Sequence, residues 1–377
     1  MGLSTAYALL TQGLEHVTVL EQEAVDHCRG TSHGVSRLLR FEYGSDLFYS
    51  KMVSLSLNRW KRLEHVSQRT LYSRTGLLVL GNEGDQFTQP SYHAMNEMEM
   101  PVERLSWQHC KQRFPQFSTY SNDNITYNAE AGILHASTCL RTLKEKIIDL
   151  GGSIFEACRV THLMHDNQLR PVRIHTSTGD ELTAERVVLA TGPWVNRLLA
   201  DLQLPVRVTR QYLLYFAGLP FSSFGIPAFP AFFTNDLYGF PLHNTTNNGY
   251  GPNWLKAASH SFGKPIDPDD ILPPDDQDIA HVTNKLRNLL PALHNARLAH
   301  VDSCMYDVTP DEGFILDHVP HDPRIVFATG LTGHGFKFGP LLGELLSSMV
   351  CATPSPVELE HFQLARFSHH RQSTSVA

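Results

Sequence analysis

Residues 5–21 read Thr-Ala-Tyr-Ala-Leu-Leu-Thr-Gln-Gly-Leu-Glu-His-Val-Thr-Val-Leu-Glu. Ala and Leu favour a short helix over residues 5–12, and Gly13 stands where a helix commonly ends in a left-handed residue. Residues 16–20 are mostly β-branched or apolar, which predicts a strand that stops at Glu21. Helix, strand and terminal acid are typical of the second half of a βαβ nucleotide-binding unit, where the acid accepts hydrogen bonds from a ribose hydroxyl.

The beginning of that unit has no counterpart in the sequence. Gly2 fits the last glycine of a G-x-G-x-x-G phosphate-binding turn, and Glu21 follows it at the expected distance. The opening strand and the first two glycines would precede Gly2. Alone this half-motif is weak evidence, because a helix–strand pair with a chance acid reads the same way. We expect the chain as written to bind a dinucleotide weakly and to be unstable.

Two later stretches return to the same pattern. Residues 186–191 (Arg-Val-Val-Leu-Ala-Thr) form a buried strand that runs into Gly192, and dinucleotide-binding folds often carry such an Ala-Thr-Gly strand end. Residues 324–329 form another buried strand, followed by a glycine-rich turn at 330–339 and an apolar helix from Leu341. The nucleotide-binding domain is therefore predicted to consist of separated pieces.

The intervening stretches lack this rhythm. Residues 85–135 are polar, and residues 206–300 contain strands, loops and one helix near 280–290. Helices are also expected at 51–66 and 137–150, and a strand at 75–80. The sequence thus predicts an α/β protein of two interleaved domains. The proposed bounds are 1–72, 135–206 and 300–360 for the nucleotide-binding domain, 73–134 and 207–299 for a substrate domain, and 361–377 for a polar tail.

Composition excludes several classes of protein. The 377 residues are 42% hydrophobic and only 18% charged, which excludes a disordered chain or a coiled coil. A formal net charge of −7 argues against binding to nucleic acid. The six cysteines include no C-x-x-C pair, so the sequence predicts no zinc ribbon, no thioredoxin-type redox pair and no metal site.

One uncharged segment raises the question of a membrane span. Residues 211–235 carry no charge and meet the length criterion, but Pro220, Pro227 and Pro230 interrupt any helix there. We interpret the segment as a strand at 212–217, an aromatic loop and a second extended stretch, which form either core or the wall of an apolar pocket. No membrane association is expected. No secretory signal is evident and the last three residues are not a peroxisomal address, so we expect a cytoplasmic protein.

Four further motifs are modest individually and specific together. They are Ser32-His33-Gly34-Val35-Ser36-Arg37-Leu38-Leu39-Arg40, Leu255-Lys256 with His260-Ser261-Phe262-Gly263, Cys304-Met305-Tyr306 with Asp311-Glu312, and Gly333-His334-Gly335-Phe336-Lys337-Phe338. With Glu21 and the Ala-Thr-Gly strand end, the chain resembles the FAD-dependent amine oxidases of the monomeric sarcosine oxidase and N-methyltryptophan oxidase family over nearly its whole length. The resemblance implies a Rossmann-like FAD-binding domain interleaved with an antiparallel-sheet substrate domain, in a monomer.

The resemblance also implies how FAD is held. In the family, a cysteine in a Cys-Met-Tyr context is joined to the flavin 8α-methyl carbon, and Cys304 matches that context. A buried unpaired cysteine is otherwise usually inert. The other residues expected to contact the cofactor are Gly2, Glu21, Ser32, His33, Val160, Gly192, Gly333, Gly335, Phe336 and Lys337. The glycine turn precedes a helix, where backbone donors favour the negative charge of a reduced flavin.

Arg40 and Lys337 are the predicted substrate clamp. Arg40 follows an apolar run and Lys337 lies between two phenylalanines, and both are unusual places for a charge without a role. Arginine offers a carboxylate two parallel donors, and the resemblance assigns both cations to the carboxylate of an amino-acid substrate. Tyr238 is expected to line the same substrate site.

The predicted catalytic residues are Lys256, His260, Arg37 and Tyr306. In the family, a lysine four residues before a histidine stabilises the anion formed from dioxygen. From spacing alone, a lysine facing solvent on a strand is the more common case. His260, Tyr306 and Arg37 are expected to surround the flavin and the substrate amine, although a lone histidine is more often structural.

The implied reaction begins with a small secondary amino acid, N-methyl or cyclic, whose neutral amine releases a hydride to FAD and becomes an imine. Dioxygen then reoxidises the flavin and forms hydrogen peroxide. Two alternatives stay open: a dehydrogenase that passes electrons to a protein acceptor, and an inactive scaffold without cofactor. Val35 stands where the family usually has an acid, which puts one polar contact near the flavin in doubt. Residues 243–253 are longer than expected and are a candidate lid.

Overall fold

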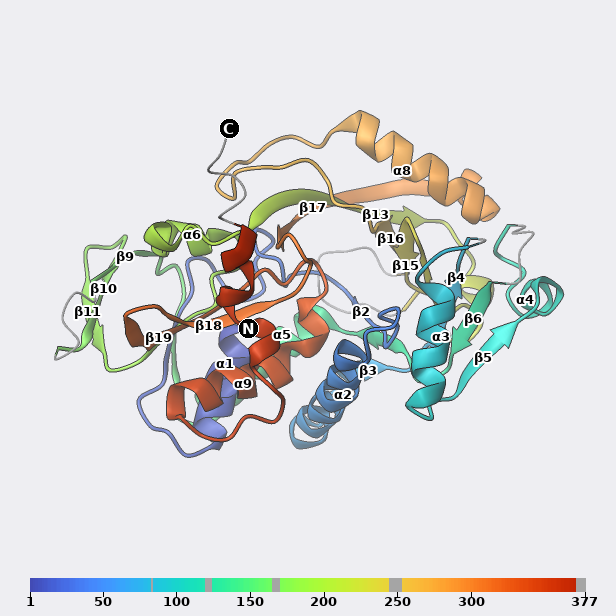
Figure 1. The fold of residues 1–377 in the computed structure, drawn as a ribbon. Helices are drawn as coiled ribbons and strands as arrows, with labels where there is room; N and C mark the ends of the chain where they lie inside the picture. The colour runs from blue at the N-terminus through green and yellow to red at the C-terminus, as the bar shows by residue number, and fades with distance from the viewer. Residues whose placement is uncertain (83, 119–123, 165–169, 244–252, 371–377) are drawn as a thin grey trace.

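The structure is a computed structural model that describes residues 1–377 except 83, 119–123, 165–169, 244–252 and 371–377. Strands β13 (Arg207–Ala217) and β17 (Arg297–Val308) arch over the middle of the molecule, with helix α8 (Asp276–Leu289) on their outer side (Figure 1). Helices α1 (Gly2–Thr11) and α9 (Gly339–Cys351) lie below them. The predicted α/β architecture is confirmed.

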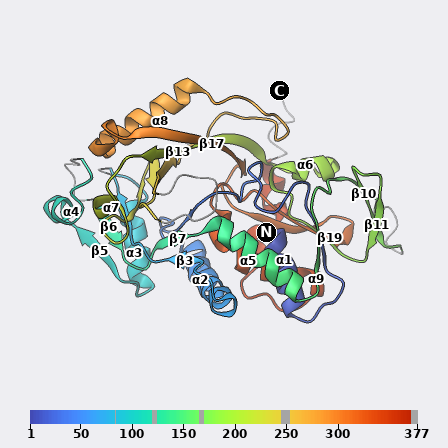
Figure 2. The same ribbon diagram turned by 180° about the vertical axis from the view of Figure 1, so that it is seen from behind.

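The opening residues form the predicted helix and strand. Helix α1 runs into Gly13, whose φ of +86° ends the helix, and strand β1 (Thr18–Leu20) follows. β1 pairs in parallel with β8 (Ser153–Phe155), which follows the predicted helix α5 (Ala136–Asp149). Parallel strands joined through a helix are the basis of nucleotide-binding folds, and Figure 2 shows α5 and α1 side by side.

A second parallel pair comes from the later pieces of the chain. β12 (Val187–Leu189) pairs in parallel with β19 (Asp322–Thr329), and β18 (Ile315–Val319) completes this sheet on the other edge of β19. The described strands of the β1–β8 pair and of the β12–β19–β18 sheet are not hydrogen-bonded to each other. A separate antiparallel sheet of β9 (Val160–Met164), β10 (Val172–Thr176) and β11 (Glu181–Ala184) lies at one end of the molecule.

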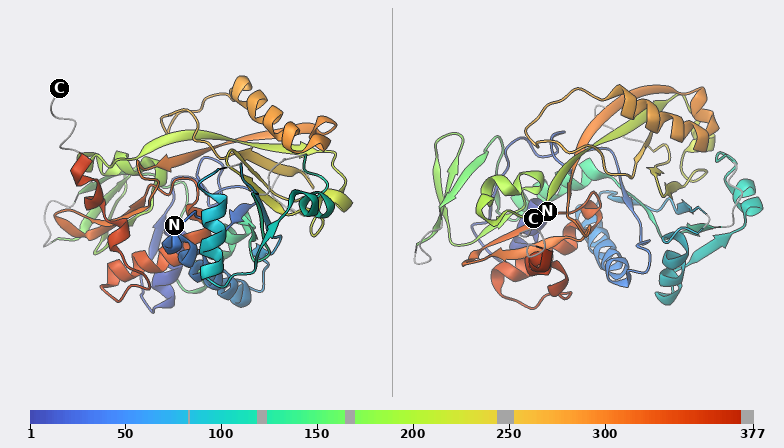
Figure 3. Two further views of the ribbon diagram at one scale, coloured as in Figure 1. Left: turned by 45° about the vertical axis from the view of Figure 1, so that its right-hand side comes forward. Right: turned by 45° about the horizontal axis from the view of Figure 1, so that its top comes forward.

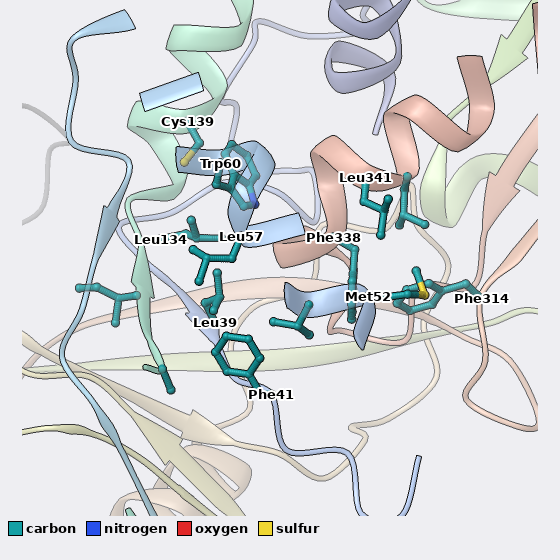
Figure 4. Close-up of a cluster of buried hydrophobic side chains, with 14 of the residues drawn as sticks. Leu39, Phe41, Met52, Leu57, Trp60, Leu134, Cys139, Phe314, Phe338 and Leu341 are labelled. Atoms are coloured by element: carbon teal, nitrogen blue, oxygen red, sulfur yellow. The ribbon is translucent and has the colours of Figure 1, made fainter. Parts of the chain in front are cut away.

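Close helix packing joins the two ends of the chain. α1 lies against α9, and a β-carbon added at Gly343 would come within 2.6 Å of the backbone of Ser4, so only glycine permits this approach. The apolar face of α9 then enters a core cluster shared with α2 (Leu47–Ser67), β2 (Arg37–Leu39) and β7 (Gly132–Leu134) (Figure 4). β2 and β3 (Tyr72–Ser73) both pair with β7.

The substrate domain is built on one sheet of eight strands. Its order is β17, β13, β16 (Leu255–Ser259), β15 (Leu237–Gly239), β14 (Ala231–Thr234), β4 (Leu77–Leu80), β6 (Ile125–Asn128) and β5 (Val102–Leu105). Three helices connect strands of this sheet, α3 (Thr88–Glu97), α4 (Trp107–Arg113) and α7 (Phe221–Phe224). In both views of Figure 3 the sheet lies beside α2.

The predicted antiparallel sheet is confirmed at all but one pair of its described strands. β4 and β14 run parallel, whereas the other pairs of this sheet are antiparallel. The two strands come from different insertions, so no hairpin dictates their relative direction. Their pairing joins both insertions into one sheet. The predicted domain boundary at 299/300 falls within β17, whose whole length pairs with β13.

The uncharged segment 211–235 forms β13, a short loop with α7, and β14, as predicted. Phe216, Phe229 and Phe232 are buried in the core, and Phe233 lines the cavity described below, so both interpretations of this segment hold. None of the helices in the described ranges is long and apolar enough to cross a membrane. In the predicted tail, Phe362 and Phe367 are buried, so packing on the body continues to that point.

Candidate active site

One cavity of about 1290 Å³ reaches from the amino end of α1 to the centre of the large sheet. It is lined by all of the residues predicted to be catalytic or to bind the substrate or the cofactor. These are Gly2, Glu21, Ser32, His33, Arg37, Arg40, Val160, Gly192, Tyr238, Lys256, His260, Cys304, Tyr306, Gly333, Gly335, Phe336 and Lys337. Their placement was predicted from motifs far apart in sequence, whereas the role of each stays a prediction.

The end of the cavity at α1 is suited to a nucleotide. The first turn of the ten-residue helix α1 lines it, and helix amino termini attract negative groups. Glu21 follows β1 and accepts hydrogen bonds from the Glu23 backbone N–H at 3.1 Å and from His27, whose Nε2 lies 3.4 Å away. Burial raises the pKa of Glu21, but these hydrogen bonds outweigh it, so the pKa lies below the ordinary value. Glu21 therefore remains an ionised acceptor.

The Arg37 side chain fixes the loop at 31–36 by hydrogen bonds to its backbone. The Arg37 guanidinium donates to the backbone oxygens of Thr31 at 2.9 Å, His33 at 2.5 Å and Ser36 at 3.1 Å. Gly34, with φ of +121°, leaves room for this guanidinium, because an added β-carbon would lie 3.1 Å from its Nη1. Arg37 thus fixes the loop and keeps a positive charge beside the cavity.

His33 in the same loop is oriented by an acid. Its Nδ1 lies 2.7 Å from the Asp26 backbone oxygen and 3.1 Å from the Asp26 carboxylate. Two acceptors at Nδ1 require a proton there. Asp26 also accepts from the Ser137 hydroxyl at 2.8 Å. Asp26 was not identified from the sequence, since an acid in a loop carries no distinguishing pattern.

Helix α2 positions the glycine turn. The Ser56 hydroxyl and the Trp60 indole N–H both donate to the Lys337 backbone oxygen, at 2.6 and 2.9 Å. Phe336 stacks on Trp60, with ring centroids 5.9 Å apart. Gly333 has φ of +72°, and an added β-carbon there would lie 2.4 Å from the Tyr306 ring. The turn therefore lies directly against β17, two residues along from Cys304.

The register of the large sheet gathers the reactive side chains on one face. β13 aligns Gln211 with Cys304 and Tyr215 with Lys256, and alternate residues of a strand point to the same side. By the same alternation Tyr306 lies on this face, and Tyr238 joins it through β15 and β16. The Tyr238 and Tyr306 hydroxyls share a hydrogen bond, and burial raises the pKa of Tyr238 to about 12.

Lys256 is a buried cation, not a surface lysine. Its side chain is 2% exposed, and its Nζ donates to the Ser36 backbone oxygen at 2.7 Å, which also accepts from Arg37. Burial lowers the pKa of Lys256 well below the ordinary value, and the Arg37 charge lowers it further, while Cys304 and Asp302 oppose this. A negative charge arriving beside Lys256 would therefore favour its protonated form.

Arg40 is held by aromatic rings. The side chain is 6% exposed, and its guanidinium carbon lies 4.5 Å from the Tyr43 ring centroid, 4.7 Å from that of Phe233 and 5.4 Å from that of Phe87. Its Nη1 is buried and has no hydrogen-bond partner among the described residues. Because buried donors are almost always paired, this donor indicates a place for a ligand acceptor.

Lys337 ends a chain of hydrogen bonds near Arg40. Lys337 is 3% exposed, and its Nζ donates to the Tyr43 hydroxyl at 2.7 Å. That hydroxyl lies 3.1 Å from His334 Nδ1, and His334 Nε2 lies 3.4 Å from the Glu312 backbone oxygen. Burial lowers the pKa of His334 well below the ordinary value, so a neutral ring accepts from Tyr43 and donates to Glu312.

Tyr43 and His334 were not assigned roles from the sequence. Tyr43 lies three residues after Arg40, which ends the first motif, so its neighbourhood was visible, but its hydrogen bond to Lys337 joins residues 294 positions apart. Burial lowers the pKa of His260 to about 3, and the nearby positive charges of Arg40 and Lys337 contribute to this shift. His260 is therefore neutral at physiological pH.

A family model described as FAD dependent oxidoreductase matches residues 1–349. The chain belongs to this family of FAD-dependent oxidoreductases. It is 32% identical to a human protein named peroxisomal sarcosine oxidase, with 97% of this chain and 93% of that one covered. It is 28% identical to an N-methyl-L-tryptophan oxidase of Yersinia pestis, with 97% and 96% covered. Both relatives are named for oxidation of amines, and the predicted resemblance is confirmed.

A solved structure confirms the fold of this oxidoreductase. NikD, an amino acid oxidase of nikkomycin biosynthesis, superposes with a TM-score of 0.79 at 21% identity, over 96% of this chain and 94% of that chain. The oxidoreductase's own cavity also fits FAD, since it exceeds the roughly 300–1,000 Å³ of ordinary ligand pockets. α1, Glu21 and the glycine turn at 333–338 offer it donors and acceptors. Of the candidate lid at 243–253, residues 244–252 lie outside the described residues.

The charge of Lys337 predicts how carboxylate binding depends on pH. Burial lowers the pKa of Lys337 well below its ordinary value, and the Arg40 charge adds to this, while Glu42 opposes it. Below that pKa the site carries two cations, and above it only Arg40 remains charged. We expect the affinity for propionate to fall as the pH rises through this lowered pKa, in titrations of the holoenzyme over the whole pH range in which the protein stays folded. Lys337→Met should bind propionate weakly with a flat profile. Constant wild-type affinity across the range would contradict the assignment.

Proposed function

We propose that this oxidoreductase is an oxidase of small secondary amino acids and that it converts dioxygen to hydrogen peroxide. The observation that carries the proposal is the pair of buried cations, Arg40 and Lys337, in the same cavity as Cys304 and the nucleotide-binding end. A buried pair of like charges is unfavourable unless an anion joins it. The names of the relatives support the class of substrate, since sarcosine and N-methyl-L-tryptophan both carry a carboxylate beside a secondary amine.

Arg40 and Lys337 bind the substrate carboxylate. The unpartnered Nη1 of Arg40 donates to one carboxylate oxygen, and the aromatic rings of Tyr43 and Phe233 contact the guanidinium. Charge-assisted bonds in such an apolar site are stronger than in water. Lys337 adds a second donor, whose direction is set by Tyr43.

The cations also prepare the amine. A bound ammonium near Arg40, Lys337 and Lys256 loses its proton more easily, because like charges disfavour the charged form. The neutral imidazole of His260 adds no further positive charge. FAD held in this cavity would supply the acceptor for the hydride of the carbon beside the nitrogen and the route for its electrons to dioxygen. Tyr238, Tyr306 and the apolar wall exclude water from this step.

A peroxide assay tests the proposal. Holoenzyme should release hydrogen peroxide with at least one of sarcosine, N-methyl-L-tryptophan or a cyclic imino acid. Arg40→Met should lower kcat/KM by roughly 100-fold, because the carboxylate loses its paired donor. Arg104→Met is the matched control, since Arg104 is exposed and, among the described residues, its guanidinium lies over the ring of Tyr92 alone. Equal loss of activity in both variants, or no peroxide with any N-alkylated amino acid, would contradict the proposal.

We also propose that Cys304 attaches FAD through a thioether. Cys304 is partly accessible, lies on the face that carries Tyr306 and Lys256, and forms no disulfide. Attachment would replace the thiol S–H and a methyl C–H bond by one S–C bond, with the two hydrogens passing to dioxygen. The wild-type protein should therefore stay yellow in the pellet after acid precipitation, and its mass should rise by that of FAD less two hydrogens. Cys304→Ser should release the colour, whereas the exposed Cys28→Ser should not. A yellow supernatant from wild type would contradict attachment, and colourless preparations would favour the inactive scaffold.

The low pKa of Lys256 gives a specific reason to consider a dehydrogenase instead, since a neutral lysine supplies no charge to dioxygen. The oxidase proposal requires Lys256 to be protonated when an anion forms beside it. Lys256→Met should then slow the reaction of the reduced enzyme with dioxygen by roughly 100-fold or more, while anaerobic reduction by substrate changes far less. Unchanged oxygen reactivity in stopped-flow measurements would favour a protein electron acceptor.

A further inference from the structure

His334 lies beside Lys337 and has no role in the proposed reaction. The His334 backbone oxygen accepts from Lys337 Nζ at 3.2 Å. The His334 ring Nδ1 lies 3.1 Å from the Tyr43 hydroxyl, and this hydroxyl accepts from the same Nζ at 2.7 Å. Among the described residues, these two oxygens are the hydrogen-bond acceptors of Lys337 Nζ. His334 supplies one of them and contacts the other.

The neighbours of the His334 ring determine which nitrogen carries the hydrogen. Nε2 lies 3.4 Å from the Glu312 backbone oxygen, which can only accept. The Phe314 ring packs on the imidazole, with ring centroids 4.7 Å apart, and holds its orientation. The neutral ring therefore carries its hydrogen on Nε2, and Nδ1 presents a lone pair to Tyr43. The Tyr43 hydroxyl donates its single hydrogen to Nδ1, so that its own lone pairs are left for Lys337.

This arrangement leaves one donor of Lys337 for a ligand. A protonated lysine carries three N–H donors. The Tyr43 hydroxyl and the His334 backbone oxygen accept two of them, and the third is left for an acceptor in the cavity that Lys337 lines. If the Tyr43 hydroxyl turned its hydrogen toward Lys337, that hydrogen would repel the ammonium group. The acceptor at His334 Nδ1 prevents this.

We propose that His334 is a positioning residue of the carboxylate clamp: it directs the Tyr43 hydroxyl and thereby aims one N–H of Lys337 at the ligand. The inference rests on the proposed binding of a carboxylate by Arg40 and Lys337. A donor that is already held in place loses less conformational entropy when the ligand binds. Because the reaction leaves the carboxylate unchanged, loss of this positioning should raise KM for the substrate and leave kcat unaltered.

Three variants separate the Nδ1 acceptor from the bulk of the ring. His334→Leu removes the acceptor and should weaken propionate binding roughly three- to tenfold, as expected for one lost hydrogen bond. His334→Asn keeps an acceptor at the δ position of the side chain and should stay within about twofold of wild type. Tyr43→Phe removes the hydroxyl and keeps the ring beside Arg40, whose guanidinium carbon lies 4.5 Å from the ring centroid. It should weaken binding at least as much as His334→Leu.

The test is calorimetric titration of the holoenzyme with propionate, at the pH at which wild type binds it most tightly. Adding His334→Leu to Tyr43→Phe should cause no further loss of affinity, because both changes break the same chain of hydrogen bonds. Three results would each overturn the role of His334: unchanged affinity in His334→Leu, equal losses in His334→Asn and His334→Leu, or additive losses in the double variant. Additive losses would mean that His334 acts on the ligand without Tyr43.

The titrations also separate this inference from the proposed function. If wild type does not bind propionate, the clamp is wrong and the inference falls with it. If wild type binds propionate and Arg40→Met does not, the clamp stands, and the variants of His334 and Tyr43 decide the inference alone. If His334→Leu does not fold, the other two single variants still decide it, since the inference requires weaker binding in Tyr43→Phe and retained binding in His334→Asn.

Discussion

The burial of positive charge in an apolar cavity is the constraint on which this site depends. Arg40 lies among three aromatic rings and keeps one donor without a described partner, and Lys337 donates to Tyr43. Two buried cations this close raise the free energy of the empty site. An anionic ligand lowers that free energy by pairing with the cations. Affinity in this site is therefore a balance of charges and not only of contacts.

The cations that line the cavity come from two different parts of the fold. The alignment of β13 with β16 and β17 places Lys256 and Cys304 on one face of the large sheet. Arg40 comes from the segment after β2, and Lys337 from the turn that α2 holds through Ser56 and Trp60. The sheet supplies one cation and the nucleotide-binding domain supplies the clamp. Because both are anchored by backbone hydrogen bonds, their relative positions follow from the packing of the two domains.

Prediction from sequence was most successful where a local pattern has one physical meaning. The helix at 5–12, the strand ending at Glu21 and the buried strand before Gly330 were all found, since apolar periodicity and glycine position specify such elements. Prediction failed at β4 and β14, whose parallel pairing depends on two insertions meeting in space. The hydrogen bond between Lys337 and Tyr43 was also missed, because it joins residues 294 positions apart that only the tertiary fold brings together.

By itself, the sequence determined the fold class, the family and the residues that line the cavity, because motifs record which side chains and backbone shapes the chemistry needs. Only the tertiary structure decided how those residues are charged and connected. The chain Lys337–Tyr43–His334, the low pKa of Lys256 and the uncompensated donor of Arg40 all depend on burial. Burial is the sum of contacts between segments hundreds of residues apart, and no local pattern encodes it.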